Sequence, residues 1–344
     1  MTMDAMPRAM LETVAKARML GKSPVGAYLR LNDWIWRHLP GSIAALRPID
    51  WYGRFLHSLA CLHADREMYL GTFFLRNRAE LELIRRLCEP IAVRRPVKIA
   101  VLGCSNGAEV YSIRWALRSI QPDGRIILHG VDVSPAALEC AREGVYSTGI
   151  SELVHEPLCA FMTAGEMEEM LDREGERLRI KASIRDGIAW HLGDAADPRT
   201  RDDLGPQDIV VANRFLCHMN PPDAERCLRD VAGLVAPGGH LFVSGVDLDV
   251  RTKVARDLGW TPAAQLLEDI HEGDRSLRND WPCKYWGLEP LDKRRSDWAL
   301  RYASAFQIGS GRESAVRPHA RAASESPSAR SRARRHDADV DPPR

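Results

Sequence analysis

A glycine-containing loop and one acidic residue occupy positions where a nucleoside-binding site needs them. Gly103-Cys104-Ser105-Asn106-Gly107 follows a short apolar run and precedes a helical pattern. Glycines at such a bend permit a sharp turn and a close approach of a ligand, and free N–H groups at a helix start attract an anion. Asp132 ends the next apolar run, where a carboxylate can accept hydrogen bonds from both ribose hydroxyls. Together they indicate a nucleoside site, although the loop alone is equally compatible with a structural turn.

The spacing of the glycines argues against a dinucleotide. The loop has the pattern G-x-x-x-G, whereas a pyrophosphate-binding loop has the pattern G-x-G-x-x-G. A ligand with a nucleoside and an amino-acid head, but no phosphate, fits the shorter loop.

The elements around these residues alternate between apolar strands and amphipathic helices. Such alternation predicts an α/β fold with a doubly wound, mostly parallel sheet covered on both faces. Pro237-Gly238-Gly239 is expected to form a turn before the last strand. The expected strands are 97–103, 125–131, 208–212 and 240–244, and the expected helices are 108–120, 135–143 and 222–235.

The regions outside this alternation differ in character. Residues 1–96 lack strand-like alternation and are expected to form a helical N-terminal region, followed by the sheet domain at 97–310. Residues 151–186 interrupt the rhythm and are expected to form a small inserted subdomain, with an acidic helix at 166–176. Residues 311–344 have almost no large apolar side chains and are expected to be a disordered tail.

Composition excludes several functional classes. The formal net charge of +1 gives no global field to attract nucleic acid, and no apolar run reaches the roughly 18 residues of a membrane span. The start of the chain lacks the apolar block of a signal peptide, so we expect a cytoplasmic protein without membrane insertion. The eight cysteines include no C-x-x-C pair, and no metal site is expected.

The motifs resemble those of the CheR-type chemoreceptor glutamate methyltransferases. AVLGCSNGAEVYS (100–112) is similar to the family's first motif, in which G-C-S-T-G-E-E-P-Y-S is usual, and GVDVSPAALECAREGVY (130–146) is similar to the second. The resemblance covers about residues 69–245. Four further segments are similar to family motifs: GTFFLRNR (71–78), IAWHLGDA (188–195), DIVVANRFLCHM (208–219) and LVAPGGHLFVSG (234–245).

This resemblance implies the fold of class I, Rossmann-like methyltransferases and S-adenosylmethionine (SAM) as the cofactor. Three departures stand out: Asn213-Arg214 inverts the family's R-N pair, Asp194 replaces an asparagine, and Leu70 replaces the asparagine before the threonine. The family motifs and the glycine loop together give these candidate cofactor-binding residues: Thr72, Arg76, Gly103, Ser105, Gly107, Glu109, Asp132, Asp194, Ala195, Asn213 and Arg214.

The acceptor implied by the resemblance is the carboxylate of a protein glutamate. A carboxylate with an ordinary pKa of about 4.3 is already an anion at neutral pH and needs no general base, and no catalytic base is identified in the sequence. The aromatic faces of Phe73 or Phe74 are candidates to face the positive sulfonium. A small-molecule acceptor and a catalytically silent SAM-binding module remain the alternatives.

Other residues have a functional and a structural interpretation. The insert at 151–186 lies where the family has a receptor-docking subdomain, and it is equally interpretable as a solvated excursion. The aromatic residues Trp281, Tyr285 and Trp286 either line an acceptor pocket or cover the sheet edge. A structural role is favoured for the remaining candidates Cys104, His191 and His218, and Tyr146 is either an acceptor-site residue or a core residue.

Overall fold

The computed structural model describes residues 24–37, 72–120, 125–147, 158–273 and 289–309, and isolated positions between 43 and 59. The chain divides into two units, Met1–Ser310 and Gly311–Arg344, and every described residue belongs to the first. The expected tail at 311–344 and the three aromatic residues near 285 therefore lie outside the described residues. None of the described helices is long and apolar enough to cross a membrane.

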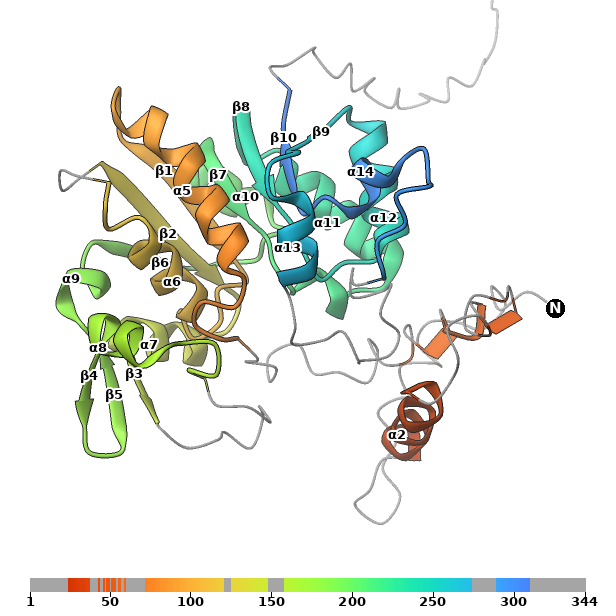
Figure 1. The fold of residues 1–344 in the computed structure, drawn as a ribbon, viewed down its shortest axis with the longest axis horizontal. Helices are drawn as coiled ribbons and strands as arrows, with labels where there is room; N and C mark the ends of the chain where they lie inside the picture. The colour runs from red at the N-terminus through yellow and green to blue at the C-terminus, as the bar shows by residue number, and fades with distance from the viewer. Residues whose placement is uncertain are drawn as a thin grey trace, which may run out of the picture. The chain divides into compact units, whose positions relative to one another are not determined.

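The centre of the fold is a seven-stranded sheet with the order β6-β2-β1-β7-β8-β10-β9 (Figure 1). The pairs from β6 to β8 are parallel, and β10 is antiparallel to both of its neighbours. This order confirms the predicted α/β fold with a mostly parallel sheet. The strands are β1 (Val97–Leu102), β2 (Ile126–Asp132), β6 (Ile188–Leu192), β7 (Gln207–Val211), β8 (Val235–Phe242), β9 (Thr261–Pro262) and β10 (Ala305–Gln307).

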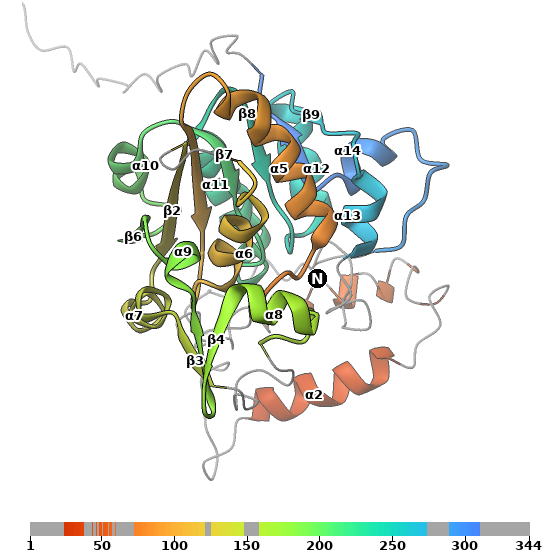
Figure 2. The same ribbon diagram turned by 60° about the vertical axis from the view of Figure 1, so that its left-hand side comes forward.

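Helices cover both faces of this sheet. Successive residues of a strand point to opposite faces, so the apolar side chains of one strand enter two different cores. Ile99 and Val101 of β1 join a core with α5 and α6, whereas Ala100 and Leu102 join a second core with α11 and α12. Figures 1 and 2 show α5 and α6 lying over β1 and β2. The helices are α5 (Arg78–Ala92), α6 (Ala108–Ala116), α7 (Pro135–Glu143), α10 (Pro198–Leu204), α11 (Pro221–Ala232), α12 (Leu248–Asp257), α13 (Leu267–Gly273) and α14 (Trp298–Tyr302).

The predicted helix start at Ser134-Pro135 is confirmed. The Ser134 side chain accepts a hydrogen bond from the Ala137 N–H, and Pro135 occupies the first turn of α7. Gly144 ends the helix with a left-handed backbone at φ 61°. The helical character expected before residue 96 is seen in α5 and in α2 (Pro24–Arg37).

The insert forms a small antiparallel sheet of order β3-β5-β4, made of β3 (Val145–Ser147), β4 (Leu171–Glu174) and β5 (Arg177–Ile180). The helix expected over 166–176 is wrong in its second half. The helix α8 (Ala164–Met170) ends at Met170, because Leu171 pairs with Ile180 and both side chains are buried. A short helix, α9 (Ala182–Arg185), then leads to β6, which belongs to the main sheet.

The turn expected at 237–239 is also wrong. These residues lie inside β8, at an irregularity in its pairing with β7 between Gln207 and Ile209. A Cβ atom on Gly239 would lie 2.7 Å from the Asp208 carbonyl oxygen. The glycine therefore permits a close approach of two strands and does not reverse the chain.

Gly107 is required by packing at the start of α6. Its φ is 87°, and a Cβ atom would lie 2.9 Å from the Trp190 ring and 3.0 Å from Ala141 Cβ. We expect Gly107→Ala to lower the free energy of unfolding by about 1–3 kcal/mol, the usual range for a strained backbone position. Urea unfolding would measure this loss. Gly175→Ala is the matched control, since Gly175 has φ 65° but open space around it; an equal loss in both variants would exclude the packing explanation.

Candidate functional site

The site lies at the carboxyl edge of the sheet, where the strand order reverses between β1 and β7. Loops that leave neighbouring parallel strands in opposite directions create a crevice at such a switch point. A cavity of about 290 Å³ occupies this position and is lined by loops after β1, β2, β6 and β7. The predicted residues that line it are Thr72, Arg76, Gly103, Ser105, Glu109, Asp132, Asp194, Ala195, Asn213 and Arg214.

Gly107 is the predicted residue that the structure does not bring to this cavity. Its α-carbon faces Trp190 and Ala141 and not the crevice. Gly103 does line the cavity, and a Cβ atom there would lie 2.9 Å from Cδ1 of Phe215. The two glycines of the loop thus make room for two different aromatic side chains.

The Asp132 carboxylate holds two loops together. Its Oδ2 accepts a hydrogen bond from the Ser105 N–H at 2.7 Å, and its Oδ1 accepts one from the Ser134 N–H at 2.9 Å. The side chain is 9% exposed and lines the cavity. Since each carboxylate oxygen can accept more than one hydrogen bond, Asp132 can still accept bonds from a ligand.

Strained backbone is concentrated beside the cavity. Ser105, Arg214 and Leu75 have positive φ values of 51°, 62° and 51°, and Leu266 is the other such non-glycine residue in the described part of the chain. Conformations of this kind persist where the surrounding structure enforces them, often at ligand sites. Ser105 Oγ is buried and has no hydrogen-bond partner among the described residues. This hydroxyl suits a polar ligand atom in the cavity.

The segment before α5 is fastened to α6 through Ser112. The Leu75 N–H donates to Ser112 Oγ at 2.9 Å, and that hydroxyl donates to the Ala108 carbonyl at 2.7 Å. Arg76 is thereby placed at the cavity, with its guanidinium carbon 5.4 Å from the centre of the Phe73 ring.

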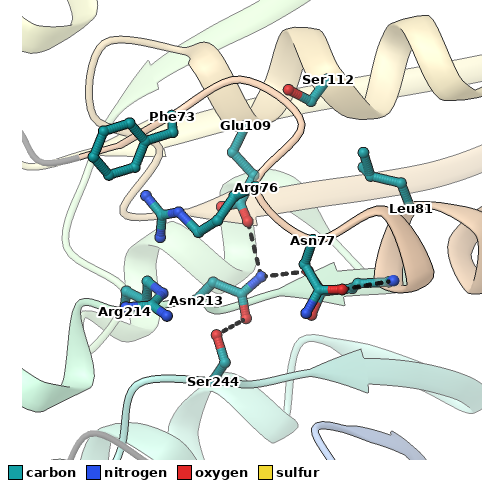
Figure 3. A pocket seen from close by; sticks show the side chains of 10 residues that line it. Phe73, Arg76, Asn77, Leu81, Glu109, Ser112, Asn213, Arg214 and Ser244 are labelled. Carbon is teal, nitrogen blue, oxygen red and sulfur yellow. Dashed lines mark hydrogen bonds between the residues drawn. The ribbon is translucent and has the colours of Figure 1, made fainter. Parts of the chain in front are cut away.

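A buried network of two carboxyl groups and one amide lies behind the cavity (Figure 3). Asn213 Nδ2 donates to Glu80 Oε1 at 2.7 Å and to Glu109 Oε1 at 2.8 Å. Ser244 Oγ donates to Asn213 Oδ1 at 2.8 Å. Burial, followed by the nearby Glu109 carboxylate, raises the pKa of Glu80 to about 8, and burial also raises the pKa of Glu109. Glu80 is absent from the sequence-based candidates.

Sequence reasoning missed several other residues that line the cavity: Val133, Ser134, Gly193, Phe215, His218 and Met219. Each follows the carboxyl end of β2, β6 or β7, so the switch-point rule applied to every strand end was the signal that could have found them. The structural role favoured for His218 does not account for its place at the cavity.

The structure changes which aromatic ring can face a ligand in the cavity. Phe74 is fully buried and packs edge-to-face on Tyr146, with ring centres 5.3 Å apart, so it cannot face a ligand in the cavity. Phe73 stacks with Arg76 and lines the smaller cavity of about 20 Å³ beside Glu80. Phe215 is the aromatic ring among the residues that line the larger cavity.

The structural interpretations of three other residues agree with their surroundings. Cys104 is 1% exposed, and burial raises the pKa of its thiol well above the usual value. His191 Nε2 lies 3.0 Å from His129 Nδ1 on the neighbouring strand and does not line the cavity. The Tyr146 hydroxyl donates to the Asn106 carbonyl at 2.7 Å, which makes Tyr146 a core residue that supports the loop.

Residues 71–253, more than half of the chain, match the CheR methyltransferase SAM-binding domain. The chain belongs to the CheR methyltransferase family. The matched part of the family is its SAM-binding domain, and SAM is therefore the cofactor of this chain. The glycine loop, Asp132 and the cavity all lie inside the matched residues.

Relatives of this CheR-family chain are similar at low identity. The probable biofilm formation methyltransferase WspC of Pseudomonas putida is 27% identical over 195 residues, which are 55% of this chain and 43% of the relative. The chemotaxis protein methyltransferase 2 of Pseudomonas aeruginosa is 26% identical over 202 residues, which are 55% of this chain and 68% of the relative. This chain thus covers less than half of the length of the WspC relative.

One solved structure of a more distant methyltransferase also aligns. The N-methyltransferase NodS from Bradyrhizobium japonicum, in complex with S-adenosyl-L-homocysteine, covers 61% of this chain and 87% of its own, with 15% identity and a TM-score of 0.32. The α/β fold of the CheR-family chain follows from its own strand order.

The two contacts of Asp132 predict a loss of stability when its carboxylate is removed. Asp132→Ala removes the acceptor of two backbone N–H groups, and hydrogen bonds to charged groups contribute about 1.5–3 kcal/mol each. We expect the variant to lose at least about 2 kcal/mol of unfolding free energy in urea. Asp194→Ala is the control, because Asp194 is exposed and the Ala196 N–H is the one described donor to its carboxylate. Equal stability of the two variants would contradict the clamping role of Asp132.

Proposed function

We propose that this chain methylates a carboxylate oxygen, with the side chain of a protein glutamate as the acceptor. The observation that carries the proposal is the pair of arginines, Arg76 and Arg214, that line one cavity. SAM brings a single carboxylate, and two guanidinium groups at one cavity offer binding positions for that carboxylate and for the carboxylate of an acceptor. Guanidinium groups match carboxylates in charge and in two-point geometry.

The remaining polar residues of the cavity suit the other parts of SAM. In this proposal Asp132 accepts hydrogen bonds from the ribose hydroxyls, and Glu109 pairs with the ammonium of the amino-acid head. Ser105 Oγ, which is buried without a described partner, donates or accepts one further bond. The ring of Phe215 offers an electron-rich face to the positive sulfonium.

Methyl transfer to a carboxylate requires mainly that the protein align the two reactants. SAM supplies an activated methyl group on a positive sulfur. An ionised acceptor carboxylate is the nucleophile, so no side chain has to remove a proton from it. In this proposal the arginines hold the carboxylate in place. Alignment of two reactants can lower a barrier by up to about 7–11 kcal/mol.

A small-molecule acceptor with a hydroxyl or amine is the second candidate, and His218 favours it. His218 is the imidazole among the residues that line the cavity, and an imidazole with a pKa near 6.5 can accept a proton at neutral pH. The relatives named as chemotaxis methyltransferases support the first candidate. In this proposal the small sheet β3-β5-β4 provides a surface for the protein acceptor.

The proposal is tested by following labelled methyl groups. The purified chain, incubated with methyl-labelled SAM and an extract of its own host, should place alkali-labile label in protein, because carboxyl methyl esters hydrolyse in base. The maximal rate at saturating SAM should be constant between about pH 6 and pH 8, because the acceptor is ionised throughout this range. Alkali-stable label in low-mass material, with a rate that falls below about pH 6.5, would instead support the His218 mechanism. Absence of any turnover would leave a SAM-binding module.

The role of Glu109 is tested by Glu109→Gln. The glutamine keeps an oxygen for Asn213 Nδ2 and removes the charge that would pair with the SAM ammonium. Loss of a charge-assisted contact of about 1.5–3 kcal/mol predicts a roughly ten- to hundredfold weaker affinity for SAM by calorimetry. The melting temperature should not fall, since the replaced carboxyl is one whose pKa burial raises. Glu89→Gln on the exposed side of α5 is the control; equal affinities in both variants would contradict the assignment.

A further inference from the structure

Glu80 has no place in the mechanism above, yet it is one of the buried charged residues in the described part of the chain. Its side chain is 6% exposed and lies in the first turn of α5, where its N–H donates to the Asn77 side chain. Asn213 Nδ2 donates to the carboxyl oxygen of Glu80 at 2.7 Å and to that of Glu109 at 2.8 Å. One amide thus joins a carboxyl group outside the cavity wall to one that lines it.

The Asn213 amide is oriented without ambiguity by these contacts. An ionised carboxylate can only accept, so the amide nitrogen faces the two acids, and the amide oxygen accepts from Ser244 Oγ at 2.8 Å. Figure 3 shows Asn213 between Ser244 and Glu109. The two hydrogens of the amide nitrogen are then shared between the two carboxyl groups. Neither acid can be replaced by a non-acceptor without leaving a buried N–H group unsatisfied.

The charges around Glu80 come from three directions. Glu109 faces it from α6, Arg76 from the loop before α5, and Arg214 from the loop after β7. The helix α13, which also packs on α5, contributes the Ile270 carbonyl that accepts from Asn77 Nδ2, and its His271 is bonded to the Glu289 carbonyl. Two carboxyl groups confined in this way do not ionise together readily.

We propose that Glu80, Asn213 and Glu109 form one unit that holds a shared proton, and that Glu80 is a positioning residue whose proton is released when a cationic amino-acid head binds at Glu109. This inference rests on the proposed cofactor site. The net charge of the site stays the same in this step, because the ligand ammonium brings one positive charge to the two acids and one proton leaves to solvent. Glu80 acts through the Asn213 amide, which directs Glu109 towards the cavity.

The inference is tested by measuring SAM affinity of the full chain by calorimetry between pH 6.5 and pH 8.5. The affinity of the wild-type chain should rise with pH by a factor that approaches tenfold per unit, the limit for one linked proton. Glu80→Gln keeps the oxygen that Asn213 needs but cannot hold the proton. Its affinity should be independent of pH and at least equal to that of the wild-type chain at pH 6.5. A slope in Glu80→Gln equal to that of the wild-type chain would overturn the inference.

Further variants and a second ligand distinguish the positioning role of Glu80 from the effect of its ionisation. Glu80→Leu removes the acceptor of Asn213 Nδ2 and should bind SAM more weakly than Glu80→Gln at every pH; equal binding would overturn the positioning role. The probe 5′-methylthioadenosine lacks the amino-acid head, so its binding to the wild-type chain should not vary with pH. Glu82→Gln, on the same helix but paired with Arg85 and Arg86 at the surface, should retain the wild-type slope.

A measurement without ligand distinguishes failure of this inference from failure of the cofactor site. Since the pKa of Glu80 is raised to about 8 in the folded chain, the folded state binds more protons than the unfolded state between about pH 4.3 and pH 8. The contribution of Glu80 to stability should therefore fall as pH rises towards 8, so the melting temperature of Glu80→Gln relative to that of the wild-type chain should rise from pH 6 to about pH 8 and then level off. A constant difference would overturn the shared proton, whereas loss of SAM binding by the wild-type chain would overturn the cofactor site.

Discussion

The structure depends on a constraint at the centre of its sheet, where β1 and β7 lie side by side although they are far apart in sequence. The chain leaves β1 towards β2 and leaves β7 towards β8, so the two exits diverge and cannot fill the space between them. The Asp132 carboxylate stabilises one wall of that space by holding two backbone N–H groups. The Asn213 amide fixes the opposite wall by joining α5, α6 and the segment after β8.

Much of the fold could be predicted because its signals are local. The apolar run before Gly103, the Ser134-Pro135 helix start and the Gly144 helix end each depend on a few adjacent residues. The two wrong predictions, the helix over 166–176 and the turn at 237–239, concern segments whose structure depends on residues distant in sequence. The residues after Met170 form a strand because Leu171 pairs with Ile180, and Pro237–Gly239 continue a strand because Asp208 packs against Gly239.

The candidate site shows the same division. Most residues named from motifs follow the ends of strands, whereas Thr72 and Arg76 precede α5 and Glu109 lies in α6. The topology brings them to one cavity, with Gly107 as the exception. Sequence alone gave no means to find Glu80, because its neighbours Glu109 and Asn213 come from other elements. Phe73 and Phe74 are adjacent in the chain, and only packing distinguishes the ring beside the small cavity from the ring in the core.

The inverted order of residues 213 and 214 has an electrostatic consequence. With asparagine at 213, a neutral amide lies between two acids, and the arginine at 214 borders the crevice. The amide gives one hydrogen to each acid without adding a charge, while the Arg214 guanidinium acts on both acids from the neighbouring position. The order of the two residues therefore separates two tasks: the neutral side chain joins the acids, and the charged one borders the crevice.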